Sequence, residues 1–141
     1  MDSINDEQIV LRRVPPSKPQ LATCTELKSG ELRATSIAMA TERGEEYLSC
    51  SLLSHTTPKQ LLDQLQKFGV DSNGWMVCIF RAKDVRETGY EIFHDPTPSD
   101  PGHCSISGQG GTVIPNKKLQ KLAKRTRILT EDELEDSSQI S

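Results

Sequence analysis

The clearest pattern of apolar and polar positions lies between Thr57 and Gly69 and predicts a helix. Thr57 is a favourable N-cap, Pro58 suits the first helical turn, and Gln60 stands where a capping box needs it. Gly69 supplies the left-handed residue with which many helices end. The apolar side chains recur at helical spacing and form one stripe, made of Leu61, Leu62, Leu65 and Phe68.

Several other segments have the patterns of strands. Residues 9–14 form a short, β-branched apolar run that stops at Pro15 and Pro16. Because proline offers no donor to a β-ladder, we expect an edge strand there. The segment 81–89 is interpreted either as a helical turn or as a long hairpin loop. Three further strands are predicted from apolar or alternating runs, at 75–80, 90–94 and 103–107.

The segment 31–53 predicts a β-hairpin. Its two arms, 31–39 and 48–52, alternate with a period of two residues, and Gly44 in the intervening turn permits a positive φ. Near the other end of the chain, residues 115–129 predict a second helix. Its inward-facing side chains would be Leu119, Leu122 and Ala123.

This order of elements predicts the α+β class, with a single small mixed or antiparallel sheet and two helices packed on it. The 141 residues suit a single domain. The two ends have almost nothing to bury. We therefore expect a flexible N-terminal tail at 1–8, one α+β domain at 9–129, and an acidic, flexible C-terminal tail at 130–141.

The charge pattern bears on possible partners. A net charge of −3 does not favour nucleic acid. Cations are nevertheless concentrated between Lys117 and Arg127, next to the acidic tail. This run is interpreted either as a solvated helix face whose positive charge the acidic tail offsets, or as a docking site for an acidic protein partner. The side chains that would serve such a site are Lys117, Lys121 and Lys124.

The four cysteines limit the chemistry and the compartment. They are far apart and include no Cys-x-x-Cys, which argues against a zinc knuckle or a redox pair. Reduced thiols, the lack of a signal-peptide pattern and the lack of a membrane-length apolar run predict a cytoplasmic protein without membrane association. No metal and no cofactor is expected.

The stretch FHDPTPSDPGHCSISGQGG, residues 93–111, concentrates the residue types of functional sites. Metal binding is not favoured, because adjacent strand residues such as His103 and Cys104 point to opposite faces. A structural interpretation is that the Asp-Pro pairs form rigid turns. His103 would then bond a main-chain carbonyl and seal the edge of the sheet.

A catalytic interpretation of the same stretch also stands. His103 would begin a strand directly after a rigid turn and would donate or accept a proton. Asp95 or Asp100 would orient its ring, and Ser36 would join the pocket. The planar guanidinium group suits an anionic substrate, and the candidates for that contact are Arg12, Arg13 and Arg33.

Five short motifs are spread through the chain: LRRVPP at 11–16, GELRATSIAM at 30–39, YLSCSLL at 47–53, DPTPSDPGH at 95–103 and LAKRTRIL at 122–129. Together they resemble a family of small, uncharacterised bacterial proteins with Arg-Arg-x-Pro-Pro and Asp-Pro-x-Pro-x-x-Pro-x-His motifs. This sequence departs from the family pattern in having Asp100 for an Asn and Gly102 for an Ala. The resemblance implies a bacterial domain and draws attention to 95–103, but it implies no activity.

Two functional hypotheses follow from the sequence. The lean hydrophobic content of 34%, the charged ends and the absence of a defined catalytic set favour a small accessory or protein-interaction domain of a larger bacterial system. The alternative is a small enzyme that acts on a phosphate- or nucleotide-containing substrate through arginine, Ser36, Asp95 and His103. Whether the protein is an enzyme stays open at this point.

Overall fold

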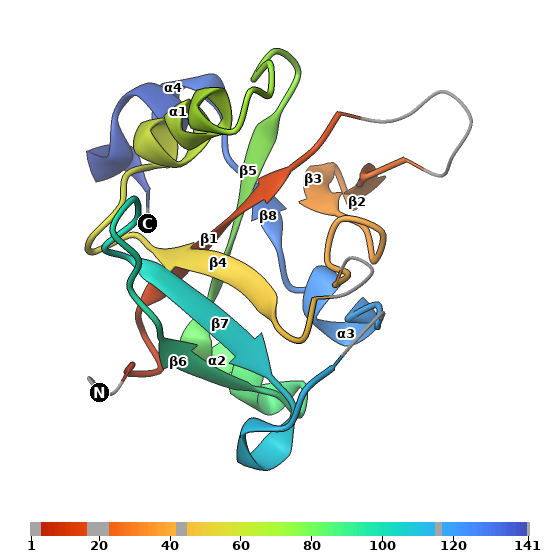
Figure 1. Ribbon diagram of the computed structural model, residues 1–141. Coiled ribbons are helices and arrows are strands. Elements are labelled where there is room, and N and C mark those ends of the chain that lie inside the picture. Colours follow the sequence, from red (N-terminus) through yellow and green to blue (C-terminus); the bar gives the residue numbers. More distant parts are fainter. Residues whose placement is uncertain (1–3, 17–22, 42–44, 115–116, 141) are drawn as a thin grey trace.

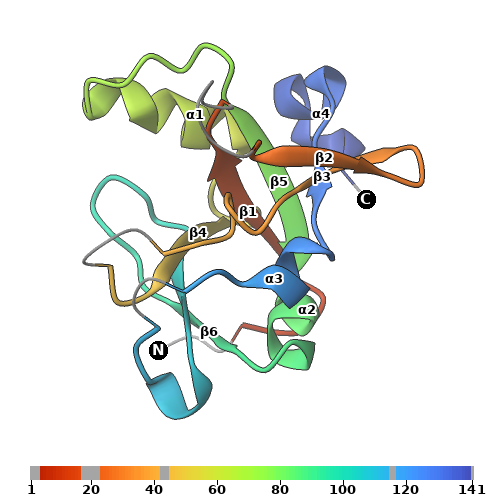
Figure 2. The same ribbon diagram turned by 90° about the vertical axis from the view of Figure 1, so that its right-hand side faces the viewer.

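The computed structural model describes residues 4–16, 23–41, 45–114 and 117–140. A six-stranded antiparallel sheet runs through it in the order β6-β7-β4-β1-β5-β8, and a separate two-stranded ribbon, β2-β3, stands beside it (Figures 1 and 2). This confirms the predicted α+β class. The strands are β1 (Ile9–Val14), β2 (Thr25–Lys28), β3 (Glu31–Ala34), β4 (Leu48–Leu52), β5 (Met76–Arg81), β6 (Glu91–His94), β7 (His103–Ser107) and β8 (Arg127–Ile128).

Four short α-helices pack on this sheet in the described part of the chain, two on each face. The helices α1 (Pro58–Lys67) and α4 (Glu131–Glu135) share an apolar cluster with β1 and β5. The helices α2 (Ala82–Glu87) and α3 (Gln120–Ala123) belong to the larger core on the opposite face. Of the two interpretations of 81–89, the helical turn is therefore confirmed, as α2. None of the described helices has the length and apolar character to cross a membrane.

The helix α1 forms as its sequence predicts. The Gln60 amide donates to the Thr57 hydroxyl, and the Thr57 amide donates to the Gln60 side chain, at 3.1 and 3.0 Å. Gly69 follows the helix with a φ of +72°. One member of the predicted stripe differs, because Phe68 is 65% exposed at the C-cap and does not enter the core.

The expectation of an edge strand at 9–14 is wrong, because β1 lies in the interior of the sheet. It pairs with β5 along its whole length and with β4 at its first half. The two prolines follow the last strand residue, Val14, and so they remove no donor from the ladder. Proline therefore marks where β1 ends and not where the sheet ends.

The hairpin predicted for 31–53 is also wrong. β3 pairs with β2, with Leu27 opposite Leu32, whereas β4 pairs with β1 and β7. The segment Ser36–Met39 between the supposed arms forms turns. Gly44 lies outside the described residues. The alternation of apolar and polar residues predicts which face of the sheet each side chain takes. It does not predict which strand pairs with which, because pairing depends on packing with distant segments.

Residues 115–116 of the helix predicted for 115–129 lie outside the described ranges, and within 117–129 the helix is reduced to the four residues of α3. Leu119, Leu122 and Ala123 are buried, as expected. The Thr126 hydroxyl then donates to the Ala123 carbonyl and accepts from the Ala34 amide, which turns the chain toward β8 and ties it to β3. These hydrogen bonds of the Thr126 side chain compete with the main-chain hydrogen bonds that would continue the helix, which is a common effect of threonine.

Described residues near both ends of the chain make specific contacts. Ile4 is buried in the core, and the Arg86 guanidinium bonds the Ile4 carbonyl and the Asp6 carboxylate. At the other end, Thr130 caps α4, and the buried Glu133 forms a bidentate pair with Arg127 at 2.8 and 2.9 Å. Polar termini are held here by ion pairs and caps, which a count of apolar residues does not detect. Residues 1–3 and 141 lie outside the described ranges.

Candidate functional site

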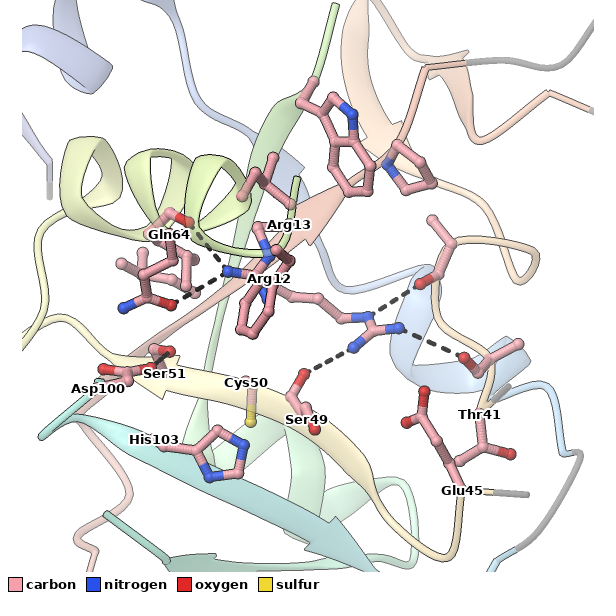
Figure 3. A pocket seen from close by; sticks show the side chains of 18 of the residues that line it. Arg12, Arg13, Thr41, Glu45, Ser49, Cys50, Ser51, Gln64, Asp100 and His103 are labelled. Atoms are coloured by element: carbon pink, nitrogen blue, oxygen red, sulfur yellow. Dashed lines mark hydrogen bonds between the residues drawn. The ribbon is translucent and has the colours of Figure 1, made fainter. Parts of the chain in front are cut away.

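A concavity of the described part of the molecule arises where β1 and β4 separate. The two strands pair at Val10–Leu52 and Leu11–Ser51 only. Continuing that register would place Arg13 opposite Ser49, but no pair forms there, while β1 stays bound to β5 and β4 to β7. The V between the strands is visible in Figure 1, and a cavity of about 630 Å³ lies in it (Figure 3).

We call this space the fork cavity. Its walls come from β1, β4, the turn before β7 and the inner face of α1. The polar side chains that line it include Arg12, Arg13, Ser49, Gln64, Asp100 and His103. Of the predicted site residues, Arg12, Arg13 and His103 therefore meet in one place. Lys118 and Glu45 also line it and carry opposite charges.

Arg12 braces the fork. Its Nη1 donates to the Ser49 carbonyl at 2.6 Å, in the place where a ladder bond between the strands would otherwise form. Nε and Nη2 donate to the carbonyls of Ala38 and Ala40, at 2.9 and 3.3 Å (Figure 3). Each of the three nitrogens thus already donates to main chain, and Arg12 joins β1 to β4 and to the segment 38–40.

Arg13 is placed differently. Its Nη1 donates to the Leu61 carbonyl and to the Gln64 side chain on α1, at 3.0 and 3.1 Å (Figure 3). Nε and Nη2 make no hydrogen bond with any described residue. Since no buried side-chain nitrogen or oxygen in these ranges lacks a partner, both nitrogens reach the solvent of the fork cavity. Burial lowers the pKa of Arg13, and the neighbouring charge of Arg12 lowers it further.

His103 is the first residue of β7, and its ring borders the fork cavity (Figure 3). The ring Nδ1 lies 2.8 Å from the Asp95 carbonyl oxygen, which can only accept, so Nδ1 carries the proton. Nε2 is left as the acceptor, and it bonds no residue of the described part. The hydrogen bond from Nδ1 to the Asp95 carbonyl confirms the expectation that His103 bonds a main-chain carbonyl. The other ring nitrogen, Nε2, stays available to the cavity.

The predicted contact between Asp95 and His103 is present, but the backbone of Asp95 makes it. The Asp95 carboxylate is more than half exposed and lies 4.0 Å from Nδ1, where it accepts from the Ser105 hydroxyl. Asp95 does not line the fork cavity. It orients the ring from behind the site.

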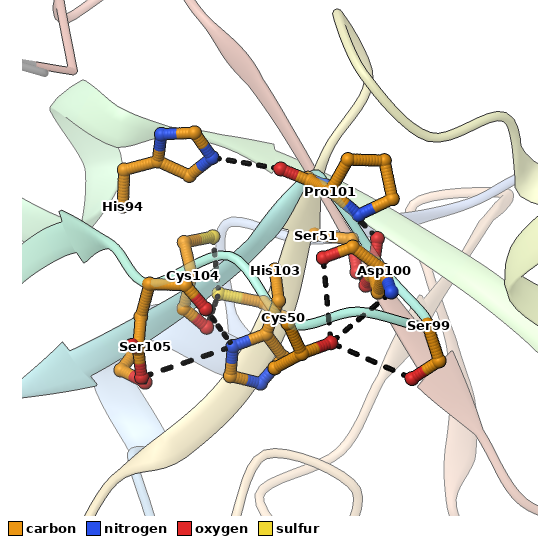
Figure 4. Close-up of polar contacts among 12 residues, drawn as sticks. Cys50, Ser51, His94, Ser99, Asp100, Pro101, His103, Cys104 and Ser105 are labelled. Carbon is orange, nitrogen blue, oxygen red and sulfur yellow. Dashed lines mark hydrogen bonds and ion pairs between the residues drawn. The ribbon is translucent and has the colours of Figure 1, made fainter.

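Asp100 has a structural function in the turn. Its buried carboxylate accepts from the hydroxyls of Ser51 and Thr56, each at 2.5 Å, and from the Gly102 amide at 3.1 Å (Figure 4). These bonds fasten the turn before β7 to β4. Gly102 is required by the same packing, because a Cβ there would lie 2.4 Å from the Thr56 Oγ1.

The other predicted residues lie elsewhere. Ser36 stands in a turn, and its neighbours Ile37 and Ala38 reach the fork cavity while Ser36 does not. Arg33 bonds Glu26 and the Lys124 carbonyl.

The basic residues are also dispersed. Lys117 lies over the Tyr90 ring, 6.0 Å from its centre, Lys121 is exposed on α3, and Lys124 borders a smaller cavity of about 300 Å³. The predicted basic helix face is not formed, since α3 spans four residues only. Within the described ranges, no three His, Cys, Asp or Glu side chains lie close enough to hold a metal ion.

The sequence analysis missed Gln64 and Ser49. Gln64 is a buried polar residue within the apolar stripe of α1, between Leu61 and Leu65, and that position was a usable signal. Ser49 and Ser51 alternate with buried residues of β4, which indicated a polar face without indicating what it meets.

No protein-family model matches the chain, and no curated protein or solved structure shows significant similarity to it. The resemblance to a bacterial family therefore stays a prediction.

Proposed function

We propose that the fork cavity binds a small phosphate- or nucleotide-containing molecule, with Arg13 as the residue that contacts its anionic group. The placement of Arg13 carries this proposal: one nitrogen is fixed to α1 and the other two reach the cavity. A fixed guanidinium with unused donors suits a phosphate or carboxylate. The volume of about 630 Å³ lies within the range of small-molecule sites, roughly 300–1,000 Å³.

Electrostatics supports an anionic ligand. Burial and Arg12 both act against the charged form of Arg13, as its lowered pKa shows, and only Asp100 acts in the opposite direction. The Asp100 oxygens are already engaged by Ser51 and Thr56. An anion in the fork cavity would therefore favour the charged form of Arg13, which burial and the neighbouring Arg12 oppose.

His103 supports the enzyme form of this hypothesis. With Nδ1–H held by the Asp95 carbonyl, Nε2 is the proton acceptor that faces the cavity. A bound hydroxyl or water would give its proton to Nε2. Replacement of His103 by Gln should abolish turnover of such a substrate while changing its affinity little, because Arg13 holds the anion.

Isothermal titration calorimetry on the full chain tests the binding proposal. The probes are inorganic phosphate, a nucleoside and the matching nucleoside monophosphate. We expect the phosphate-bearing probes to bind, and Arg13→Gln to weaken them about 10- to 100-fold, as for loss of a charge-assisted hydrogen bond. Arg33→Gln is the matched control, because Arg33 bonds Glu26 outside the cavity. Equal affinities in both variants, or no binding by the wild type, would contradict the proposal.

A second candidate is the accessory interaction domain expected from the sequence, in the cytoplasm of a bacterium. The observation that favours it is the apolar side chain of Phe68, which lines the fork cavity and is 65% exposed. A protein partner that covered Phe68 would bury apolar surface that now meets water. The four cysteines are free thiols, which supports the cytoplasmic location.

Affinity capture with point variants tests this second candidate. Removal of 117–141 is unsuitable, because that segment contains β8 and α4. Phe68→Ser and Lys121→Glu are compared with the wild type instead. If one defined partner that binds the wild type saturably is no longer captured by Phe68→Ser alone, docking at Phe68 is supported. If it is no longer captured by Lys121→Glu alone, a basic docking site is supported. The same captured proteins in all three samples would contradict both forms.

A further inference from the structure

Two cysteines face each other across the strands that border the fork cavity. Cys50 of β4 and Cys104 of β7 are directly opposed in the antiparallel register. Their sulfur atoms lie 3.1 Å apart and share a hydrogen bond (Figure 4). At this distance the two sulfur atoms are in contact, but no covalent bond joins them, and both cysteines are free thiols.

The backbone geometry suits a disulfide at this place. The Leu52 amide bonds the Gly102 carbonyl two residues along, so Cys50 and Cys104 occupy the next hydrogen-bonded position of the ladder. Directly opposed residues of that kind have Cα atoms about 5.5 Å apart, within the range that disulfides span. The sulfurs need to approach by only about 1 Å to reach the length of an S–S bond.

One of the two cysteines borders the fork cavity. Cys50 lines the cavity between Ser49 and Ser51, whereas Cys104 is fully buried. The hydrogen bond with Cys50 raises the pKa of Cys104, and burial raises it further, so Cys104 keeps its proton. The reactive member of the pair is therefore Cys50.

We propose that Cys50 and Cys104 form an oxidation site that a peroxide entering the fork cavity converts to an intramolecular disulfide. The Cys50 sulfur attacks a peroxide oxygen and breaks the O–O bond, which yields a sulfenic acid and, from hydrogen peroxide, one water. The Cys104 sulfur then attacks Cys50. Its proton leaves with the sulfenic hydroxyl as a second water, so the two thiols lose two electrons and the peroxide gains them.

This inference does not rest on the proposed phosphate-containing ligand. The pair is defined by β4 and β7 alone, and the oxidant needs only access to Cys50. Failure of the calorimetric experiment would leave it standing, and failure of the oxidation experiment would leave the ligand proposal standing.

Mass spectrometry of the native wild-type chain tests the proposal. The protein is treated with dilute hydrogen peroxide, its remaining thiols are alkylated, and it is then digested. We expect a mass loss of about 2 Da for one disulfide and a linked peptide pair that contains Cys50 and Cys104. Two of the four cysteines should stay alkylatable. The absence of this link, a link through other cysteines, or a link that forms only in urea would overturn the proposal.

Two variants sharpen the result. Cys78→Ala is the matched control, because Cys78 is buried on β5 with its sulfur 4.0 Å from the Met39 sulfur, and burial raises its pKa to about 12. This variant should form the disulfide as the wild type does. Cys104→Ala should instead stop at the Cys50 sulfenic acid, which dimedone traps. Trapping at Cys78 in place of Cys50 would contradict the assigned order of reaction.

Discussion

The half of the main sheet formed by β5 and β1 presents apolar side chains to α1, whereas the half formed by β4 and β7 presents serines and a histidine to a turn. One cross-strand row shows the change. Ile79 of β5 pairs with Leu11 of β1. Leu11 pairs with Ser51 of β4, which pairs with His103 of β7. Since directly opposed residues share a face, the same surface turns from apolar to polar within four strands.

The two halves are also covered by different means. Leu11 and Ile79 are buried against Leu61 of α1 in one apolar cluster. On the other half, Asp100 fastens the turn before β7 through the hydroxyls of Ser51 and Thr56. The packing of α1 excludes water from the sheet beneath it, whereas the turn before β7 leaves the fork cavity open at its side. The comparison indicates that the face of β5 and β1 under α1 supplies stability, and that the site lies where β4 leaves β1.

The largest effect should come from the apolar half. Leu11→Ala removes a fully buried side chain between the sheet and α1 and should lower the free energy of unfolding by about 4 kcal/mol. Chemical denaturation monitored by circular dichroism measures this. Leu27→Ala is the control, since Leu27 is 73% exposed, and it should change stability by less than about 0.5 kcal/mol. Similar losses in the two variants would mean that the apolar half does not dominate stability.

The next effect belongs to the polar half. Asp100→Ala removes a carboxylate that accepts three hydrogen bonds, and it should cost about 3 kcal/mol because two buried hydroxyls lose a charged partner. The same denaturation experiment measures it. Asp63→Ala on the exposed face of α1 serves as the control and should be nearly neutral. If Asp100→Ala were equally neutral, the turn would be held by something other than this carboxylate.

A smaller loss is expected from crowding in the same turn. Gly102→Ala places a Cβ against the Thr56 hydroxyl and the Leu52 carbonyl, and should cost about 2 kcal/mol. Combination with Thr56→Ala relieves the closest of these contacts. The double variant should therefore lose less than the sum of the two single losses, and strict additivity would exclude the predicted clash.

The smallest effect concerns the last helix. The bidentate bond with Arg127 lowers the pKa of Glu133 from 4.5 to about 2. The folded state thus favours the charged carboxylate, which stabilises the protein above pH 4.5 and loses that contribution as the pH falls toward 2. Glu133→Gln should cost about 1 kcal/mol at pH 7, since the pair is partly exposed, and nothing near pH 2.

Denaturation across this pH range is the measurement, with Glu135→Gln as the exposed control. A Glu133→Gln deficit that stayed constant from pH 7 to pH 2 would show that the carboxylate charge is not its cause. A pH-dependent deficit in Glu135→Gln of the same size would show that the effect is not specific to Glu133.

Features whose determinants lie within a few residues could be predicted from the sequence. The caps of α1, the apolar run of β5 and the strands at β6 and β7 are of this kind. The contact of His103 with Asp95 belongs here too, because only eight positions separate them. A proline-braced turn makes such a contact nearly unavoidable.

Features that depend on distant segments could not be predicted. The fork exists because β4 pairs with β1 for two positions and then departs, and no local pattern encodes that length. Arg12 meets Ser49 across 37 positions, and Arg13 meets Gln64 across 51. Two adjacent arginines thus have different tasks, a brace and a candidate anion contact, which the sequence presents as equivalent.

An NMR titration tests the central claim most directly, namely that the fork cavity between β1 and β4 is the ligand site. Uniformly ¹⁵N-labelled protein is titrated with the nucleoside monophosphate used in calorimetry. We predict saturable shifts of the Arg13, Ser49 and His103 amide signals, with the Val77 and Ile79 signals of the apolar half unchanged. Saturable shifts confined to residues outside the fork cavity, or no shift at any residue, would contradict the account.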